Sequence, residues 1–190
     1  MVFLQIFSVA RFLTTLLVPF LFFVLPFLFL KLERKSISES FKILHLDFSS
    51  LKGKKLVSTI ADSLKLFVYM LALYFAIAII LSLFNLLDSD KVSALLKSQP
   101  IYVLFIAVFL SPLSEEIFFR GYLQNKFGAV VSAVIFGSLH YYPYFSLAEI
   151  LGALAIGLLL GSYVRKNNNL FPAIVAHMLF NALSVSMLFL

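Results

Sequence analysis

The sequence contains no cysteine and few charged residues. Of its 190 residues, 13% are Asp, Glu, Lys or Arg, while 62% are hydrophobic. Without cysteine the chain cannot build a disulfide framework, a thiol nucleophile or a zinc site of thiolates. Its apolar content lies well above the roughly 45–50% typical of soluble domains. The sequence therefore predicts a membrane protein.

Long uncharged runs predict an all-α, polytopic transmembrane helix bundle of about six spans. The fourth run is short enough that a re-entrant segment stays open. The first run follows Arg11 without a small-residue cleavage site, so we expect a retained span rather than a signal peptide. We expect two regions, a two-span region over 1–99 with a basic connection and a four-span core over 100–190. The runs are 12–30, 66–87, 101–113, 127–139, 146–164 (interrupted only by Glu149) and 170–190.

The distribution of basic residues predicts the orientation of these spans. Segment 31–65 holds eight of the fifteen Lys and Arg residues, and cytoplasmic connections collect such residues. A crossing fourth segment gives both termini outside and leaves Lys91 and Lys97 on the outer side. A re-entrant fourth segment would instead place Arg165 and Lys166 outside. In the crossing topology four more basic residues join the cytoplasmic side: Arg120, Lys126, Arg165 and Lys166.

The net charge of +6 follows from this orientation, so we expect no nucleic-acid partner. Two interpretations of the basic segment 31–65 stay open. It lies on the anionic lipid leaflet, where each basic residue contributes roughly 1 kcal/mol, or it is an ordinary solvated connection. Membrane lipid is the partner common to all of these spans.

A few polar groups within the spans are candidates for function. An ionisable side chain inside a membrane costs several kcal/mol unless it is paired or faces an aqueous cavity. On a helix Glu116 and Arg120 lie four residues apart and can form an ion pair, whereas Glu115 is turned about 100° away. We therefore expect Glu115 to point into a cavity as a general base. The candidates are Glu115, Glu116, Arg120, His140, Glu149, His177 and Asn181.

The same four-residue spacing recurs in the later spans. It places Phe136 one turn from His140, and His177 one turn from Asn181. At the helical rise of about 1.5 Å per residue, four polar residues lie roughly 10–20 Å above the cytoplasmic surface and can converge. They are Glu115, His140, His177 and Asn181. The alternatives are an ion pair that only locks two helices, and histidines that are hydrogen-bonded core residues.

Three motifs carry a resemblance to a known family. Residues 115–120 read EEIFFR, residues 136–140 read FGSLH and residues 177–181 read HMLFN. They match EExxxR, FxxxH and HxxxN in that order, each in a hydrophobic segment. The chain thus resembles the CPBP intramembrane proteases, also called the Abi family, named for CAAX proteases and bacteriocin-processing enzymes. The resemblance covers about residues 100–190.

The resemblance implies peptide-bond hydrolysis within the membrane. Glu115 and His140 would hold and activate a water, with Glu115 as general base. His177 and Asn181 would donate hydrogen bonds to the oxyanion of the tetrahedral intermediate. The supporting residues would be Glu116, Arg120 and Phe136.

The resemblance leaves the cofactor and the substrate open. Glu115, His140 and His177 could supply three ligands to zinc, but no HExxH motif is present and the same residues can act without metal. The substrate would be a prenylated CAAX peptide, a bacteriocin-like peptide precursor or a membrane-bound regulator. The compact chain favours a prokaryotic cell membrane, with the site opening toward the cytoplasmic half, and the oligomeric state is open.

Two other classes of function remain. An ion or proton transporter also buries Glu, His and Arg in its spans, and Glu149 could extend such a relay. No inverted repeat or pair of broken helices supports this alternative. The other is a non-catalytic membrane binding or immunity protein that retains a protease-like site.

Overall fold

The computed structural model describes the backbone of residues 2–189 and the side chains of residues 13, 15–142 and 145–189, so the side chain of Arg11 lies outside the described residues. Within this part of the chain every regular element is helical. Two elements, η2 (Ile106–Leu110) and η3 (Glu116–Leu123), are π-helical, and two, η1 (Phe48–Leu51) and η4 (Met187–Phe189), are short 3-10 turns. The α-helices are α1 (Val2–Leu32), α2 (Ile37–Ile43), α3 (Gly53–Leu83), α4 (Ser89–Lys97), α5 (Ile101–Phe105), α6 (Ser111–Glu115), α7 (Gln124–Phe127), α8 (Ala129–Tyr144), α9 (Leu147–Asn167) and α10 (Phe171–Ser186).

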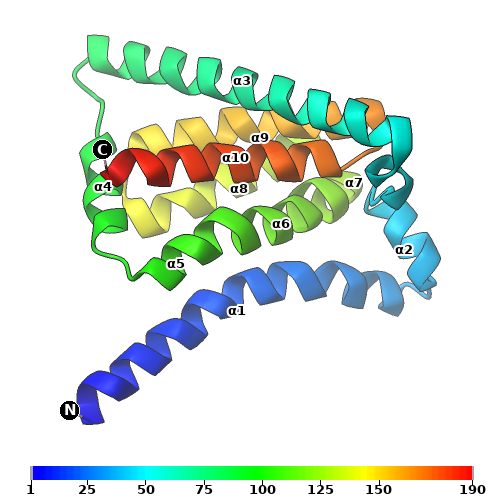
Figure 1. Cartoon of the computed structure of the whole chain (residues 1–190), viewed down its shortest axis with the longest axis horizontal. Helices are drawn as coiled ribbons and strands as arrows, with labels where there is room; N and C mark the ends of the chain where they lie inside the picture. The colour runs from blue at the N-terminus through cyan, green and yellow to red at the C-terminus, as the bar shows by residue number, and fades with distance from the viewer. Residues whose placement is uncertain (1, 190) are drawn as a thin grey trace.

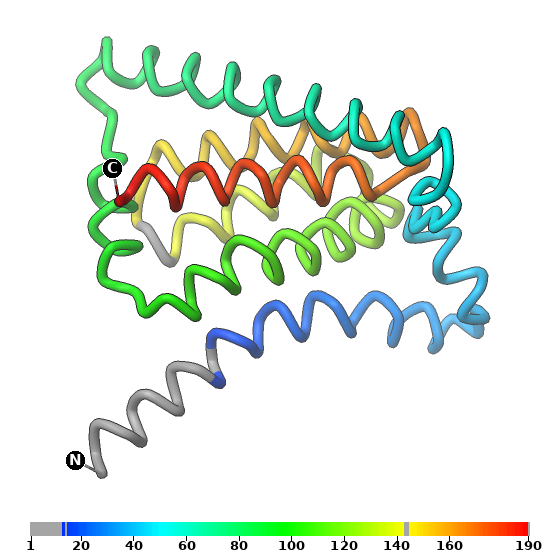
Figure 2. Tube along the Cα trace, in the orientation of Figure 1, coloured from blue at the N-terminus to red at the C-terminus, as the bar shows by residue number. Residues whose placement is uncertain are grey.

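The helices form a polytopic bundle, as predicted. Helix α3 packs against α9 and α10, while α1 packs against α6 and η3 on the other side of the bundle (Figure 1). The elements α5 to α7, with the two π-helical segments between them, follow one another as a single irregular helix between α1 and α10 (Figure 2). The end of α10 lies beside α4, at the far end of the bundle from α2.

Among the residues that the structure describes, five helices are long and apolar enough to cross a membrane. The expected fourth span is α8, a continuous apolar helix that the short turn at residues 145–146 joins to α9. At 1.5 Å per residue, its 16 residues span roughly 24 Å, less than the hydrocarbon core of a typical bilayer. The expected six spans are therefore five long helices and one short one. The five are Thr15–Leu32, Gly53–Leu83, Ile101–Phe127, Leu147–Asn167 and Phe171–Phe189.

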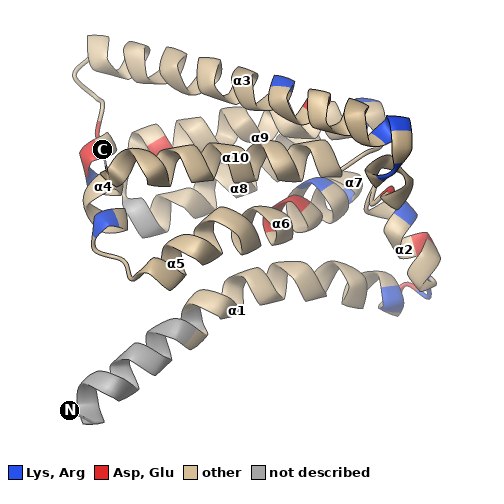
Figure 3. Ribbon diagram, in the orientation of Figure 1, with Lys and Arg blue, Asp and Glu red and all other residues tan. Residues whose placement is uncertain are grey.

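Basic residues gather at one end of the bundle. Figure 3 shows most of them around α2, the start of α3 and α7, whereas Lys91 and Lys97 lie on α4 at the opposite end. This is the separation on which the predicted orientation rests, with the α2 end in the cytoplasm.

Helices α8 and α9 approach closely because they carry glycine where they meet. A Cβ atom on Gly137 would lie 3.0 Å from Leu154 Cβ and 3.1 Å from the Ile150 carbonyl oxygen. A Cβ on Gly157 would lie 3.2 Å from both Ala133 Cβ and Arg120 Nη2. Small residues at helix crossings are the usual means of close packing in membranes. This contact places α8, which carries Phe136 and His140, firmly against the bundle.

The start of α9 is capped by Asp88, which lies in the connection between α3 and α4. Its carboxylate accepts hydrogen bonds from Ser146 Oγ (2.7 Å) and from the backbone N–H groups of Leu147 (3.0 Å) and Ala148 (3.1 Å). Lys91 lies 3.1 Å from the same carboxylate and also donates to the Phe145 carbonyl. Burial raises the pKa of Asp88, but the hydrogen bonds from these donors outweigh it and bring the pKa below its ordinary value. One side chain thus joins the α3–α4 connection to the α8–α9 turn.

We predict that Asp88→Asn lowers the unfolding free energy at neutral pH by about 1–2 kcal/mol, the usual value of a helix cap. Because the folded-state pKa is lowered, this contribution is present above the ordinary aspartate pKa of about 4 and is lost as the pH falls toward the folded-state value. Denaturant unfolding in detergent should be measured at several pH values. The difference in unfolding free energy between wild type and Asp88→Asn should become smaller as the pH falls. Asp90→Asn, a change at an exposed residue in the first turn of α4, serves as the control and should be nearly neutral. Equal losses in both variants would contradict the capping role.

Candidate active site

The helix that carries the EExxxR motif is irregular on both sides of Glu115. Glu115 ends α6, η2 precedes this short helix, and Glu116 begins η3. The sequence predicted an ordinary α-helix here, and it missed both π-helical segments. Their carbonyl groups accept hydrogen bonds from side chains on other elements, which holds the wider turns in place. These bonds run from Asn181 Nδ2 to Ala107 O (2.9 Å), from Ser132 Oγ to Phe119 O (2.8 Å) and from Asn125 Nδ2 to Gly121 O (2.7 Å).

The predicted ion pair between Glu116 and Arg120 is confirmed, and it is fully buried. Arg120 Nη1 lies 3.0 Å from Glu116 Oε1, and the two side chains are 2% and 0% exposed. The guanidinium carbon lies 4.1 Å from the centre of the Phe136 ring, so a cation–π contact supports the arginine. Glu116 Oε2 and both Arg120 Nη atoms find no hydrogen-bond partner among the described residues. The pair is held by charge and packing rather than by a complete hydrogen-bond network.

His177 contacts both glutamates, which spacing along the sequence did not predict. Its Nδ1 lies 2.8 Å from Glu116 Oε1, and its Nε2 lies 4.0 Å from Glu115 Oε2. The carboxylate at Nδ1 accepts from the ring, so Nε2 carries a proton only when both ring nitrogens are protonated. The buried imidazole therefore joins the ion pair to the neighbouring glutamate.

Glu115 and His140 line one cavity, here called the Glu115 cleft, with a volume of about 370 Å³. His140 Nδ1 lies 2.8 Å from the Phe136 carbonyl oxygen, which can only accept, so this nitrogen bears the proton and Nε2 is the free acceptor in the neutral ring. The Phe136 and His140 ring centres are 4.4 Å apart, as the spacing predicted. The lining comprises Val18, Phe22, Glu115, Phe119, Phe136, Leu139, His140 and Tyr142. Two of these residues come from α1, which the sequence motifs did not indicate.

Two other candidates lie elsewhere. The Asn181 amide is bonded to the Ala107 carbonyl, and Asn181 is not part of the lining of the Glu115 cleft. Glu149 lines a separate cavity of about 340 Å³ near α4, together with Tyr74 and Ser93. The structure therefore brings together Glu115, His140 and His177 but does not join Glu149 to them.

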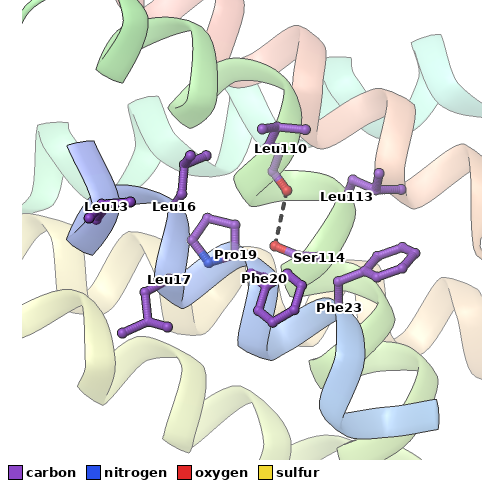
Figure 4. A pocket seen from close by; sticks show the side chains of 9 residues that line it. All are labelled: Leu13, Leu16, Leu17, Pro19, Phe20, Phe23, Leu110, Leu113 and Ser114. Atoms are coloured by element: carbon purple, nitrogen blue, oxygen red, sulfur yellow. Dashed lines mark hydrogen bonds between the residues drawn. The ribbon is translucent and has the colours of Figure 1, made fainter. Parts of the chain in front are cut away.

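A second cavity, here called the α1 crevice, begins at the residue before Glu115. It has a volume of about 390 Å³ and an almost entirely apolar lining. Figure 4 shows side chains of α1 facing those of η2 and α6, with Ser114 Oγ donating to the Leu110 carbonyl. At about 100° per residue, the α1 side chains in the crevice and those in the Glu115 cleft point to roughly opposite sides of α1. The lining is Leu13, Leu16, Leu17, Pro19, Phe20, Phe23, Leu110, Leu113 and Ser114.

The three proposed zinc ligands do not form a preformed metal site. Among the described residues, no group of three or more His, Asp or Glu side chains is arranged to hold a metal ion. His177 Nε2 and Glu115 Oε2 are 4.0 Å apart, and His177 Nδ1 is directed at Glu116. His177 Nε2 and Glu115 Oε2 are thus farther apart than two ligands of one tetrahedral zinc ion, and no step is derived through a metal.

Comparison with protein families agrees with this site. Residues 97–183 match the family described as "Type II CAAX prenyl endopeptidase Rce1-like". This part of the chain is similar to the Rce1-like family. The match contains all three motifs and is consistent with the CPBP resemblance. No curated protein and no solved structure matches the chain.

We predict that Arg120→Gln lowers the unfolding free energy by about 3–5 kcal/mol, because it leaves Glu116 charged and buried without its partner. The matched control is Lys126→Gln, which breaks the Lys126–Glu33 pair (2.7 Å) while removing the same charge from the same irregular helix. That pair is about one-third exposed, so its loss should cost about 1 kcal/mol or less. Unfolding curves in mixed micelles measure both changes. A small, equal effect in the two variants would show that the buried pair is not a structural requirement.

Proposed function

We propose that the protein is a glutamate-dependent intramembrane endopeptidase of the CAAX type. The observation that carries this proposal is the placement of Glu115 and His140 on one cavity wall, with His177 beside Glu115. Glu115 lies near the middle of the Ile101–Phe127 span, so the cleft is at membrane depth. The family match supports the same class of reaction.

In this mechanism, Glu115 activates a water molecule held with the help of His140. The free Nε2 of neutral His140 accepts a hydrogen bond from the water, and the Glu115 carboxylate takes one of its protons as the water oxygen attacks the peptide carbonyl carbon. The tetrahedral intermediate then breaks its C–N bond, and the proton held by Glu115 passes to the leaving nitrogen. The products are a carboxylate and an amine.

In the proposed mechanism, His177 and Asn181 donate hydrogen bonds to the oxyanion, and their existing hydrogen bonds limit which N–H groups are available for this. His177 donates from Nε2 only when doubly protonated, because Nδ1 already serves Glu116. Asn181 uses one of its two amide N–H bonds on Ala107 and keeps the other for the oxyanion. Glu116 and Arg120 position His177 without touching the substrate, whereas Phe136 packs against Arg120 and His140 and also lines the cleft.

We further propose that the substrate is a prenylated peptide and that the Glu115 cleft opens toward the cytoplasmic half. The α1 crevice and the Glu115 cleft meet α6 at consecutive residues, Ser114 and Glu115. The crevice is apolar and would hold the prenyl group, while the peptide lies in the cleft that contains the carboxylate and the imidazole. A peptide precursor or membrane-bound regulator without such a group would not need the crevice.

We predict that Glu115→Gln slows peptide cleavage by about 10²–10⁴-fold with an unchanged melting temperature, since the amide cannot accept the proton of water. The assay is turnover of a fluorogenic prenylated peptide by the full chain in lipid nanodiscs. Glu149→Gln is the control, because it removes an intramembrane carboxylate from the separate cavity. It should retain cleavage. Equal activity of wild type and Glu115→Gln would overturn the assignment, and peptide binding without any turnover would favour a binding protein.

The prenyl group should also increase cleavage efficiency. We predict a lower KM for a prenylated peptide than for the same peptide without the group, because the crevice buries apolar surface at about 25 cal/mol per Å². Leu17→Asn, which places a polar side chain in the crevice, should remove this preference while leaving turnover of the unprenylated peptide intact. Equal KM values for the two peptides would contradict the substrate class but not the catalytic role of Glu115.

A further inference from the structure

Another cavity lies at the corner between α1 and α2, away from the Glu115 cleft. This cavity, the corner groove, has a volume of about 680 Å³ and is lined on its apolar side by Phe23, Phe27, Leu28 and Phe41. Lys31 and Lys35 line its other end. The groove follows the last part of the Thr15–Leu32 span, so its apolar part lies at the depth of lipid chains and its basic part at the level of headgroups.

The corner is rigidly built. Arg34 has a positive φ of 61°, and the N–H groups of Arg34 and Lys35 donate to the carbonyls of Lys31 and Leu30, both at 2.9 Å. This is a Schellman motif, which ends α1 and fixes the direction of the following residue. Ser36 then begins α2 with a reciprocal capping box to Glu39. The two lysines therefore sit at the two ends of a fixed turn rather than on a free loop.

The acidic side chains near this turn are already engaged. Glu33 is paired with Lys126 at 2.7 Å, and Glu39 accepts from the Ser36 N–H at 2.8 Å. Among the described residues, no ion pair is formed by Lys31 or Lys35. Two exposed ammonium groups thus stand at the mouth of an apolar groove without an ion-pair partner among the described residues, and Lys35 interacts with Glu39 only at longer range.

We propose that the corner groove binds one anionic phospholipid. The phosphate lies between Lys31 and Lys35, and an acyl chain runs along α1 over Leu28 and Phe27 toward Phe23. Phe23 is eight residues before Lys31, which gives the chain a path of roughly 12 Å at the helical rise. Basic sites at the membrane surface select anionic over zwitterionic headgroups, and the apolar groove adds a requirement for the chain. This site is independent of the proposed peptidase activity.

The test measures lipid binding to the full chain by native mass spectrometry. Phosphatidylglycerol and phosphatidylcholine with the same acyl chains are compared. Wild type should retain one phosphatidylglycerol in preference to phosphatidylcholine. The double variant Lys31→Gln/Lys35→Gln should bind phosphatidylglycerol about tenfold or more weakly than wild type. The matched control is Lys52→Gln/Lys54→Gln, which removes the same charge from the same basic segment but outside the groove. The control variant should bind phosphatidylglycerol at most about threefold more weakly than wild type.

Three outcomes would overturn the proposal. Equal losses in the two double variants would mean general attraction to the basic surface without a site. Retention of both lipids to the same extent would remove the role of the headgroup. Competition by soluble glycerol phosphate as effective as that by phosphatidylglycerol would assign the lysines to a free phosphate compound. Since neither lysine touches the Glu115 cleft, peptide cleavage by Lys31→Gln/Lys35→Gln should stay at the wild-type level and shows that the variant is folded.

Discussion

The arrangement of the site depends on one buried charge pair. Arg120 and Glu116 are almost completely removed from solvent, and an unpaired charge there would be prohibitive. Phe136 lies under the guanidinium and His177 lies on the carboxylate, so the pair fixes an aromatic ring on α8 and an imidazole on α10 at the same time. The three helices that supply the motifs are thereby held in one relative position.

The division of labour between the adjacent glutamates follows from this pair. Glu116 is committed to the arginine and His177, while Glu115 is directed at the cleft, within 4.0 Å of the other nitrogen of His177. In the proposed mechanism, Glu115 exchanges a proton with water while Glu116 remains the counter-ion of Arg120, so catalysis and structural support fall to different carboxylates. In the proposed mechanism, the apolar side chains that α1 places in the cleft limit access of bulk water to Glu115.

Sequence reasoning was strongest for contacts within one helix. The i, i+4 spacing gave the Glu116–Arg120 pair and the Phe136–His140 contact, because helix geometry alone determines which side chains are neighbours. It did not give the contact between His177 and Glu116, the Asp88 cap or the place of Val18 in the cleft, since each depends on how distant helices pack. Hydropathy predicted six spans and already marked the fourth run as short, and α8, which carries His140, is a helix of 16 residues.

The π-helical segments affect where related sequences can gain or lose a residue during evolution. A π turn holds one more residue than the α turn it replaces. Loss of one residue within 106–110 would allow a regular α-helix to form there, and the helix before it would rotate by about 100° relative to Glu115. The residues after that point would keep their positions. A single-residue deletion within this membrane span can therefore be tolerated at residues 106–110, and we expect alignments of related chains to show gaps there.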